Sequence, residues 1–144
     1  TQSRSSAASD VYKRQELAVL GRELSFEPPT ATHVLAAIEQ PLVLGALTVK
    51  SPLRLFLTRC AAHYLGLEKQ GDQVLDPVAR FHLSNGARIE RINWFADPSP
   101  KGLKQSHGLM VNYLYDLKRI DKNRQLMAKN IAPVSGDVED LFFS

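Results

Sequence analysis

The sequence predicts a mixed α+β domain, in which several helices are followed by a helix–turn–strand and one further strand. Its 144 residues fit one ordinary domain or a piece of a larger one, and 44% of them are hydrophobic, which is enough for a core. Apolar residues recur at helical spacing in the first half of the chain. Two later segments are instead rich in the β-branched and aromatic residues that are typical of strands.

The chain divides by composition into a head, a helical part, a central part and a tail. The first fifteen residues have neither apolar periodicity nor the apolar core of a signal peptide, and they resemble translated sequencing-adapter read-through. We therefore interpret 1–15 as a non-native head and 16–144 as the domain proper. Within the domain we expect a helical segment at 16–68, a core that carries the motifs at 69–120 and a tail at 121–144.

Three helices are expected in the helical segment, and the third has the clearest pattern. Weaker apolar stripes predict helices at 16–24 and 30–40, each followed by proline. The third helix is expected to begin after Ser51, an N-cap residue followed by proline, and to end at Gly66. Its apolar positions repeat at three and four: Leu53, Phe56, Leu57, Cys60, Ala61, Tyr64 and Leu65. The apolar run at 41–49 is expected to be a buried helical turn or a strand.

A fourth, short helix follows from the same capping logic. Asp76 precedes a proline and is expected to cap a helix that runs to Leu83. Asn85 and Gly86 tolerate positive φ and are expected to close that helix in a turn. Residues 119–130 predict an exposed helix, whereas the acidic end of the chain from Gly136 is uninformative.

Two strands are expected next, separated by a loop. The first covers 87–96, and its alternation is imperfect because Ile89 and Ile92 are three residues apart, which leaves room for a bulge. Prolines and a glycine at 97–102 predict a loop. The second strand covers 108–115, and its alternate residues should share one face. That face carries Leu109, Val111, Tyr113 and Tyr115.

Charge, cysteine content and motif searches exclude several classes of function. The formal net charge is +3, and the head supplies +2 of it, so no basic surface for nucleic acid is indicated. No apolar run approaches the roughly 20 residues of a membrane span. Cys60 is the only cysteine, and a buried, inert thiol in a reducing cytoplasmic compartment is the simplest interpretation. The four histidines lack ligand spacing, so we expect no metal.

Two long motifs carry a family resemblance. Residues 76–97 read DPVARFHLSNGARIERINWFAD, and residues 106–115 read SHGLMVNYLY. Upstream, SPLRL at 51–55 is followed by CAAHYL at 60–65. Together these segments resemble the malonyl-CoA decarboxylase family. The resemblance is close over 50–120 and looser before it, and we see little of it beyond Lys122.

The resemblance implies a fold, a reaction and a substrate. Such enzymes convert malonyl-CoA to acetyl-CoA and carbon dioxide without a cofactor, on a domain similar to N-acetyltransferases (GNAT fold). In N-acetyltransferases the corresponding helix usually carries a tyrosine that acts as general acid, at the position where this chain has His82. The family also uses a serine and an acid from an upstream segment that this chain does not include. The 144 residues alone are therefore expected to be inactive or feeble.

Three residues are candidates for the site. Loss of carbon dioxide leaves a thioester enolate, so the enzyme must stabilise that charge and protonate the carbon. His82 is the expected proton donor, since histidine titrates near neutral pH. Tyr115 is expected to hydrogen-bond the substrate or His82, and Arg91 to meet phosphates or the malonyl carboxylate. Each also has an ordinary explanation: a core histidine at a helix end, a strand aromatic and a surface charge.

Two other functions stay open beside the decarboxylase. The chain could belong to a CoA-dependent acyltransferase of the same superfamily, which moves an acyl group to an amine. It could also be a non-catalytic helical module, and then nothing would require His82 and Tyr115 to meet. For the decarboxylase we expect malonyl-CoA as substrate, no nucleic-acid or membrane partner, a homo-oligomer at full length and a cytoplasmic location.

Overall fold

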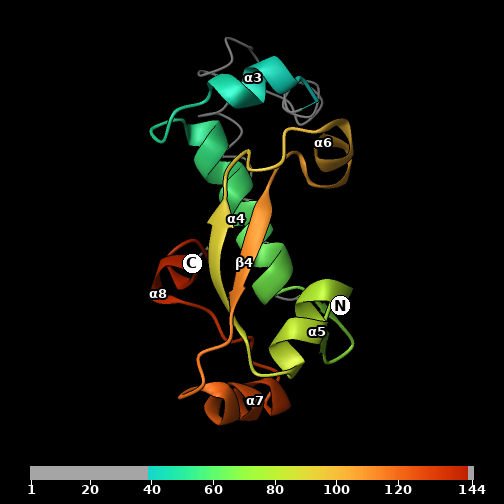
Figure 1. Ribbon diagram of the computed structural model, residues 1–144, viewed down its shortest axis with the longest axis vertical. Helices are drawn as coiled ribbons and strands as arrows, with labels where there is room; N and C mark the ends of the chain where they lie inside the picture. The colour runs from blue at the N-terminus through green and yellow to red at the C-terminus, as the bar shows by residue number, and fades with distance from the viewer. Residues whose placement is uncertain (1–38, 143–144) are drawn as a thin grey trace, which may run out of the picture. The chain divides into compact units, whose positions relative to one another are not determined.

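The computed structural model describes residues 39–142 (Figure 1). The expected head at 1–15, the helix at 16–24 and most of the helix at 30–40 lie outside the described residues. The chain forms two compact units, Thr1–Phe56 and Leu57–Ser144. The boundary falls inside one helix, α4 (Pro52–Gly66), and the two units are described separately below.

The described part of the first unit contains α3 (Pro41–Ala46) and the beginning of α4. The apolar run expected to be a buried helical turn or a strand begins with the helix α3, in which Leu44 is fully buried. The expected burial of the whole run was wrong, because Leu42 and Val49 are largely exposed. The predicted start of α4 is confirmed, because the Ser51 hydroxyl accepts a hydrogen bond of 3.2 Å from the backbone N–H of Arg54. The predicted end of α4 at Gly66 is also confirmed.

The second unit combines short helices with two antiparallel strand pairs, which confirms the predicted mixed α+β class. After α4 its elements are β1 (Lys69–Gln70), β2 (Gln73–Val74), α5 (Pro77–Ser84), β3 (Arg88–Asn93), α6 (Pro100–Ser106), β4 (Met110–Leu114), α7 (Ile120–Ala128) and α8 (Gly136–Glu139). β1 pairs with β2, and β3 pairs with β4. No helix of the described part is both long and apolar enough to cross a membrane.

One hydrophobic cluster connects the helices of this unit to the longer strand pair. Its buried members come from α4, β2, α5, β3 and α8: Ala62, Leu65, Val74, Ala79, Leu83, Ile89, Ile92 and Val138. Leu109, Val111 and Tyr113 of the β4 segment pack against the cluster from the other strand. The strand alternation predicted for these three residues is therefore confirmed.

The strand β3 contains a bulge, at the place where the sequence left room for one. Its register against β4 shifts between Ile89, which pairs with Tyr113, and Arg91, which pairs with Asn112. The additional residue is Glu90. Because of it, both isoleucines of β3 reach the core although they are three residues apart.

The predicted loop at 97–102 was wrong in its second half, where α6 begins. The Ser99 hydroxyl accepts a 3.0 Å hydrogen bond from the N–H of Gly102, and Pro100 is the first helical residue. Two prolines and a glycine suggested a loop, yet serine followed by proline is the same start signal that correctly placed α4. The glycine fits because a Cβ at Gly102 would lie within 2.5 Å of the Asp97 backbone oxygen.

The end of the chain is more ordered than its composition predicted. Residue Val134 forms a parallel bridge with Ile89, and the Ser135 hydroxyl donates to the Glu90 carbonyl at 2.8 Å. Ser135 also caps α8, whose Val138 is fully buried. The sequence was uninformative for this acidic segment, because its order depends on contacts with a distant strand.

Candidate active site

Helix α5 places His82 at the end of a rigidly anchored segment. The Asp76 carboxylate accepts a 2.9 Å hydrogen bond from the N–H of Ala79, which confirms the predicted cap. Ala79 and Leu83 are fully buried, so they fix the face of α5 that meets the core. His82, in the last turn and next to Leu83, is consequently held half-buried rather than free in solvent.

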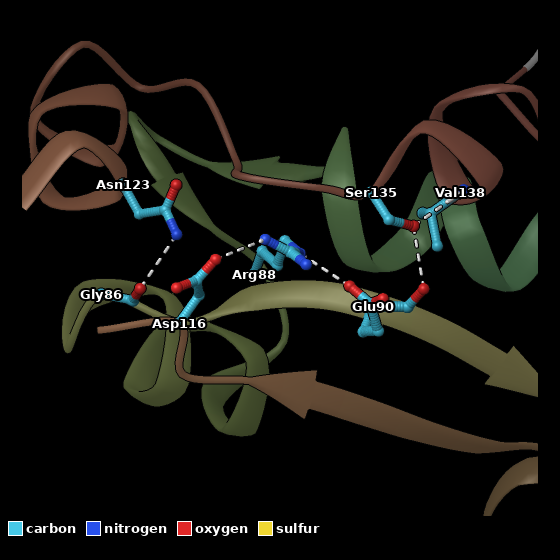
Figure 2. A network of polar contacts seen from close by, with 7 residues as sticks. All are labelled: Gly86, Arg88, Glu90, Asp116, Asn123, Ser135 and Val138. Carbon is cyan, nitrogen blue, oxygen red and sulfur yellow. Dashed lines mark hydrogen bonds and ion pairs between the residues drawn. The ribbon is translucent and has the colours of Figure 1, made fainter. Parts of the chain in front are cut away.

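The turn after α5 is held by the helix α7. Gly86 has a φ of +96°, and its carbonyl accepts a 3.0 Å hydrogen bond from the buried side chain of Asn123 (Figure 2). A Cβ at Gly86 would lie 2.6 Å from a side-chain carbon of Ile120, so α7 also packs directly on the turn. The turn that follows His82 is thus held by two contacts with α7.

His82 and Tyr115 form a hydrogen bond, as expected from the two motifs. The Nδ1 atom of His82 and the hydroxyl of Tyr115 are 2.7 Å apart, although the residues are 33 positions apart in the chain. Tyr115 lies directly after β4 and is exposed. A non-catalytic helical module would not require this contact, so the contact favours a catalytic domain.

A second tyrosine, Tyr113, stacks on the same imidazole. The ring centroids of His82 and Tyr113 are 4.4 Å apart, and the ring planes differ by 21°. The sequence placed Tyr113 on the same strand face as Val111 and Tyr115 but assigned it no part in the site. The alternation of Tyr113 with Val111 predicted which residues share its strand face. That Tyr113 meets His82 depends on how β4 packs against α5, which the alternation does not reveal.

The segment after Tyr115 is fixed by an ion pair with β3. The Asp116 carboxylate lies 3.7 Å from an Nη atom of Arg88, and Arg88 also contacts Glu90 at 2.6 Å (Figure 2). The Asp116 side chain accepts from the N–H of Lys118, and its carbonyl accepts from the N–H of Arg119. Arg88 and Asp116 therefore help to keep Tyr115 beside His82.

The remaining candidate, Arg91, lies away from this pair. Directly paired strand residues project from the same face of a sheet, and Arg91 pairs with the exposed Asn112. Tyr113, the next residue along β4, projects from the opposite face, toward the core. The structure thus does not bring Arg91 to His82, and its role in substrate binding stays a prediction.

Burial of Tyr113 predicts a loss of stability at high pH. Burial, with a smaller contribution from the negative charge of Asp76, raises the pKa of Tyr113 to about 12. An unfolded chain would release this proton near pH 10, so between about pH 10 and 12 the folded state binds more protons. The free energy of unfolding should therefore fall as the pH rises through this range.

The variant Tyr113→Phe tests that prediction, because phenylalanine keeps the ring but cannot ionise. Urea unfolding near pH 9 and near pH 11 should show a smaller loss of stability in the variant than in the original protein. An equal loss in both proteins would show that Tyr113 does not keep its proton in the folded state.

Two hollows lie elsewhere on this unit, and neither is lined by His82. The larger, of about 610 Å³, lies between the end of α4, β3, α7 and α8, and its cations include Lys69, Arg119 and Lys122. The smaller, of about 410 Å³, lies beside the β1–β2 pair and includes Arg80 and Arg124. His82 itself is half-buried and lies beside the exposed Phe81 and Tyr115.

Comparison with known proteins decides the family. The family model for the malonyl-CoA decarboxylase C-terminal domain matches residues 14–140. The chain belongs to the malonyl-CoA decarboxylase family. The match extends past Lys122 to the end of α8, so the expectation of little resemblance there was wrong.

Relatives and solved structures of malonyl-CoA decarboxylases agree with this assignment. The mitochondrial enzyme of Rattus norvegicus is 53% identical over 77 residues, which are 52% of this chain and 16% of that protein. That of Anser anser anser is 51% identical over 67 residues, 46% of this chain and 13% of that protein. The crystal structure from Cupriavidus metallidurans has a TM-score of 0.72 and 37% identity, covering 88% of this chain and 31% of that one.

A second crystal structure, from Rhodopseudomonas palustris, gives nearly the same result. It has a TM-score of 0.69 and 37% identity, and the match covers 86% of this chain and 30% of that one. The chain thus spans about a third of the length of these structures and a smaller share of the curated relatives. The activity and substrates of the full-length relatives are therefore proposals for the protein that contains this chain.

Proposed function

We propose that the full-length protein containing this chain decarboxylates malonyl-CoA to acetyl-CoA and carbon dioxide. Family membership supports the reaction class. The observation that carries the proposal is the 2.7 Å contact between His82 and Tyr115, because it unites the two motifs by which the sequence resembles the family. An imidazole paired with a phenol supplies the proton-transfer group that this reaction needs.

The reaction breaks one carbon–carbon bond and forms one carbon–hydrogen bond. The bond between Cα and the malonyl carboxylate breaks, carbon dioxide leaves, and the electron pair moves into the thioester as an enolate. Cα then takes one proton, which yields acetyl-CoA. The thioester carbonyl itself accepts the electrons, so neither a metal ion nor biotin is required by the chemistry.

In this reaction His82 delivers the proton through Nε2. Its other nitrogen, Nδ1, is occupied by Tyr115, which leaves Nε2 as the nitrogen that can face a substrate. A protonated ring donates its Nδ1–H to the Tyr115 oxygen and its Nε2 proton to Cα. After transfer the neutral ring keeps the Nδ1–H bond, and Nε2 is reprotonated from solvent. Tyr115 thus holds one tautomer through the cycle.

A carbon-dioxide release assay on the full-length protein tests the proposal. We expect one carbon dioxide and one acetyl-CoA for each malonyl-CoA consumed, with the rate unchanged by a metal chelator or by avidin, which captures biotin. If the protein instead transferred an acetyl group from acetyl-CoA to an amine, and released no carbon dioxide from malonyl-CoA, the acyltransferase alternative would replace this proposal.

The remaining expectations about the full-length protein are proposals of the same kind. We propose an N-acetyltransferase-like fold for the whole domain, a homo-oligomer and no nucleic-acid or membrane partner. A cytoplasmic location also stays a proposal, and the vertebrate relatives are named as mitochondrial proteins. Sedimentation of the purified protein and microscopy of a tagged copy would test the assembly and the location.

A further inference from the structure

Among residues 39–142, three aromatic rings contact the imidazole of His82, and one of the three is stacked on it. Phe81 and Tyr115 meet the ring edge-on, with interplanar angles of 74° and 68°. Tyr113 is stacked, with centroids 4.4 Å apart and planes inclined by 21°. Resting on the proposed decarboxylation, we propose that Tyr113 is a positioning residue, whose ring fixes the plane of the His82 imidazole and so aims Nε2 at the substrate carbon.

The hydrogen bond to Tyr115 cannot fix that plane alone. A single contact at Nδ1 leaves the ring free to tilt about the line that joins the nitrogen and the oxygen. The second side-chain torsion of histidine is also broad, so the side chain itself does not choose one plane. A flat surface against the ring removes this freedom, and proton transfer depends steeply on such alignment.

Tyr113 is suited to be that surface because it belongs to the rigid part of the strand pair. It pairs with Ile89, whose side chain is fully buried, and it packs against the hydrophobic cluster. Tyr115, by contrast, lies beyond the end of β4 and is 41% exposed. The platform is therefore Tyr113, whereas Tyr115 supplies the hydrogen bond.

The contribution of Tyr113 comes from its ring and not from its hydroxyl. Within residues 39–142 the Tyr113 hydroxyl makes no hydrogen bond, whereas the ring contacts His82 directly.

Three variants of the full-length protein test this inference. Tyr113→Phe keeps the stacked ring and should retain kcat within about twofold. Tyr113→Leu removes the ring and should lower kcat about tenfold with little change in KM, as expected for misalignment of a proton donor. Val111→Ala is the matched control, since it also weakens the core face of β4 but leaves the ring stacked on His82 in place; its kcat should stay near the original value.

A nuclear magnetic resonance measurement separates this inference from the proposed function. The ¹⁵N signals of the His82 ring should shift or broaden in Tyr113→Leu and stay unchanged in Tyr113→Phe and Val111→Ala, whether or not the protein releases carbon dioxide. Unchanged signals and unchanged kcat in Tyr113→Leu would overturn the inference. Equal losses of kcat in the Phe and Leu variants would also overturn it, because the hydroxyl would then be the active part. If the ¹⁵N signals of His82 respond to the variants as expected but the original protein releases no carbon dioxide from malonyl-CoA, the proposed function is wrong and the inference about Tyr113 stands.

Discussion

Replacing His82 with asparagine in the full-length protein should lower kcat for carbon-dioxide release by a factor of about one hundred or more. Asparagine can still hydrogen-bond to the Tyr115 hydroxyl, but its amide is too weak an acid to deliver a proton to Cα. Losses of about one hundred to ten thousand are typical when a general acid is removed. KM should change little, because His82 acts on the developing carbanion and not on the bulk of the CoA moiety. Steady-state assays of released carbon dioxide measure both constants.

His107 provides a matched control for that substitution. It closes α6 with a φ of +52°, a conformation that asparagine tolerates well, so His107→Asn makes the same chemical change without backbone strain. This variant should keep kcat near the original value. Normal turnover in His82→Asn would remove the basis for assigning the proton transfer to His82.

The second large effect should follow from Gly86→Ala, in the turn that supports His82. The φ of +96° is unfavourable for alanine, and strain of this kind costs about 1–2 kcal/mol. The added Cβ would also meet Ile120 at 2.6 Å and the Ile120 backbone near 3.1 Å, and such overpacking costs about 1–3 kcal/mol more. We expect the free energy of unfolding to fall by about 2–5 kcal/mol in denaturant titrations.

Gly71 provides the control for this prediction, because it shares the backbone strain but not the crowding. Its φ is +63°, yet a Cβ placed there would meet nothing within 4 Å. Gly71→Ala should therefore cost only about 1–2 kcal/mol. Equal losses in the two variants would show that contact with α7 does not stabilise the turn after His82.

Local signals in the sequence predicted the helices that matter for the site. Ser51 and Asp76, each followed by proline, mark the beginnings of α4 and α5 through capping bonds that involve only neighbouring residues. The same signal at Ser99 was overlooked because the prolines and the glycine around it suggested a loop. That error came from weighing composition above capping, so the sequence did contain the information.

Other features depend on contacts between distant parts of the chain. The acidic end is held in place by the bridge between Val134 and Ile89. No local pattern in that segment predicts this bridge. The face on which Arg91 lies depends on the bulge at Glu90, and the sequence left room for the bulge without placing it. The stacking of Tyr113 on His82 likewise requires the packing of β4 against α5.

The site residues were therefore only partly predictable. His82 and Tyr115 were named from the family resemblance, and the structure brings them together at 2.7 Å, while their roles in the reaction remain proposals. The sequence assigned Tyr113 to one face of its strand, but it did not predict that this ring would stack on His82. Periodicity indicates the face of a strand, whereas the partner across the core is set by tertiary structure.

The most direct test of the central claim is a crystal structure of the full-length protein with a malonyl-CoA analogue that cannot lose carbon dioxide. We predict that Nε2 of His82 lies about 3–3.5 Å from the carbon that corresponds to Cα, the range of a near-attack geometry, while Nδ1 still contacts Tyr115. An analogue whose reacting carbon lies far from His82, for example in the hollow lined by Lys69 and Lys122, would contradict the account.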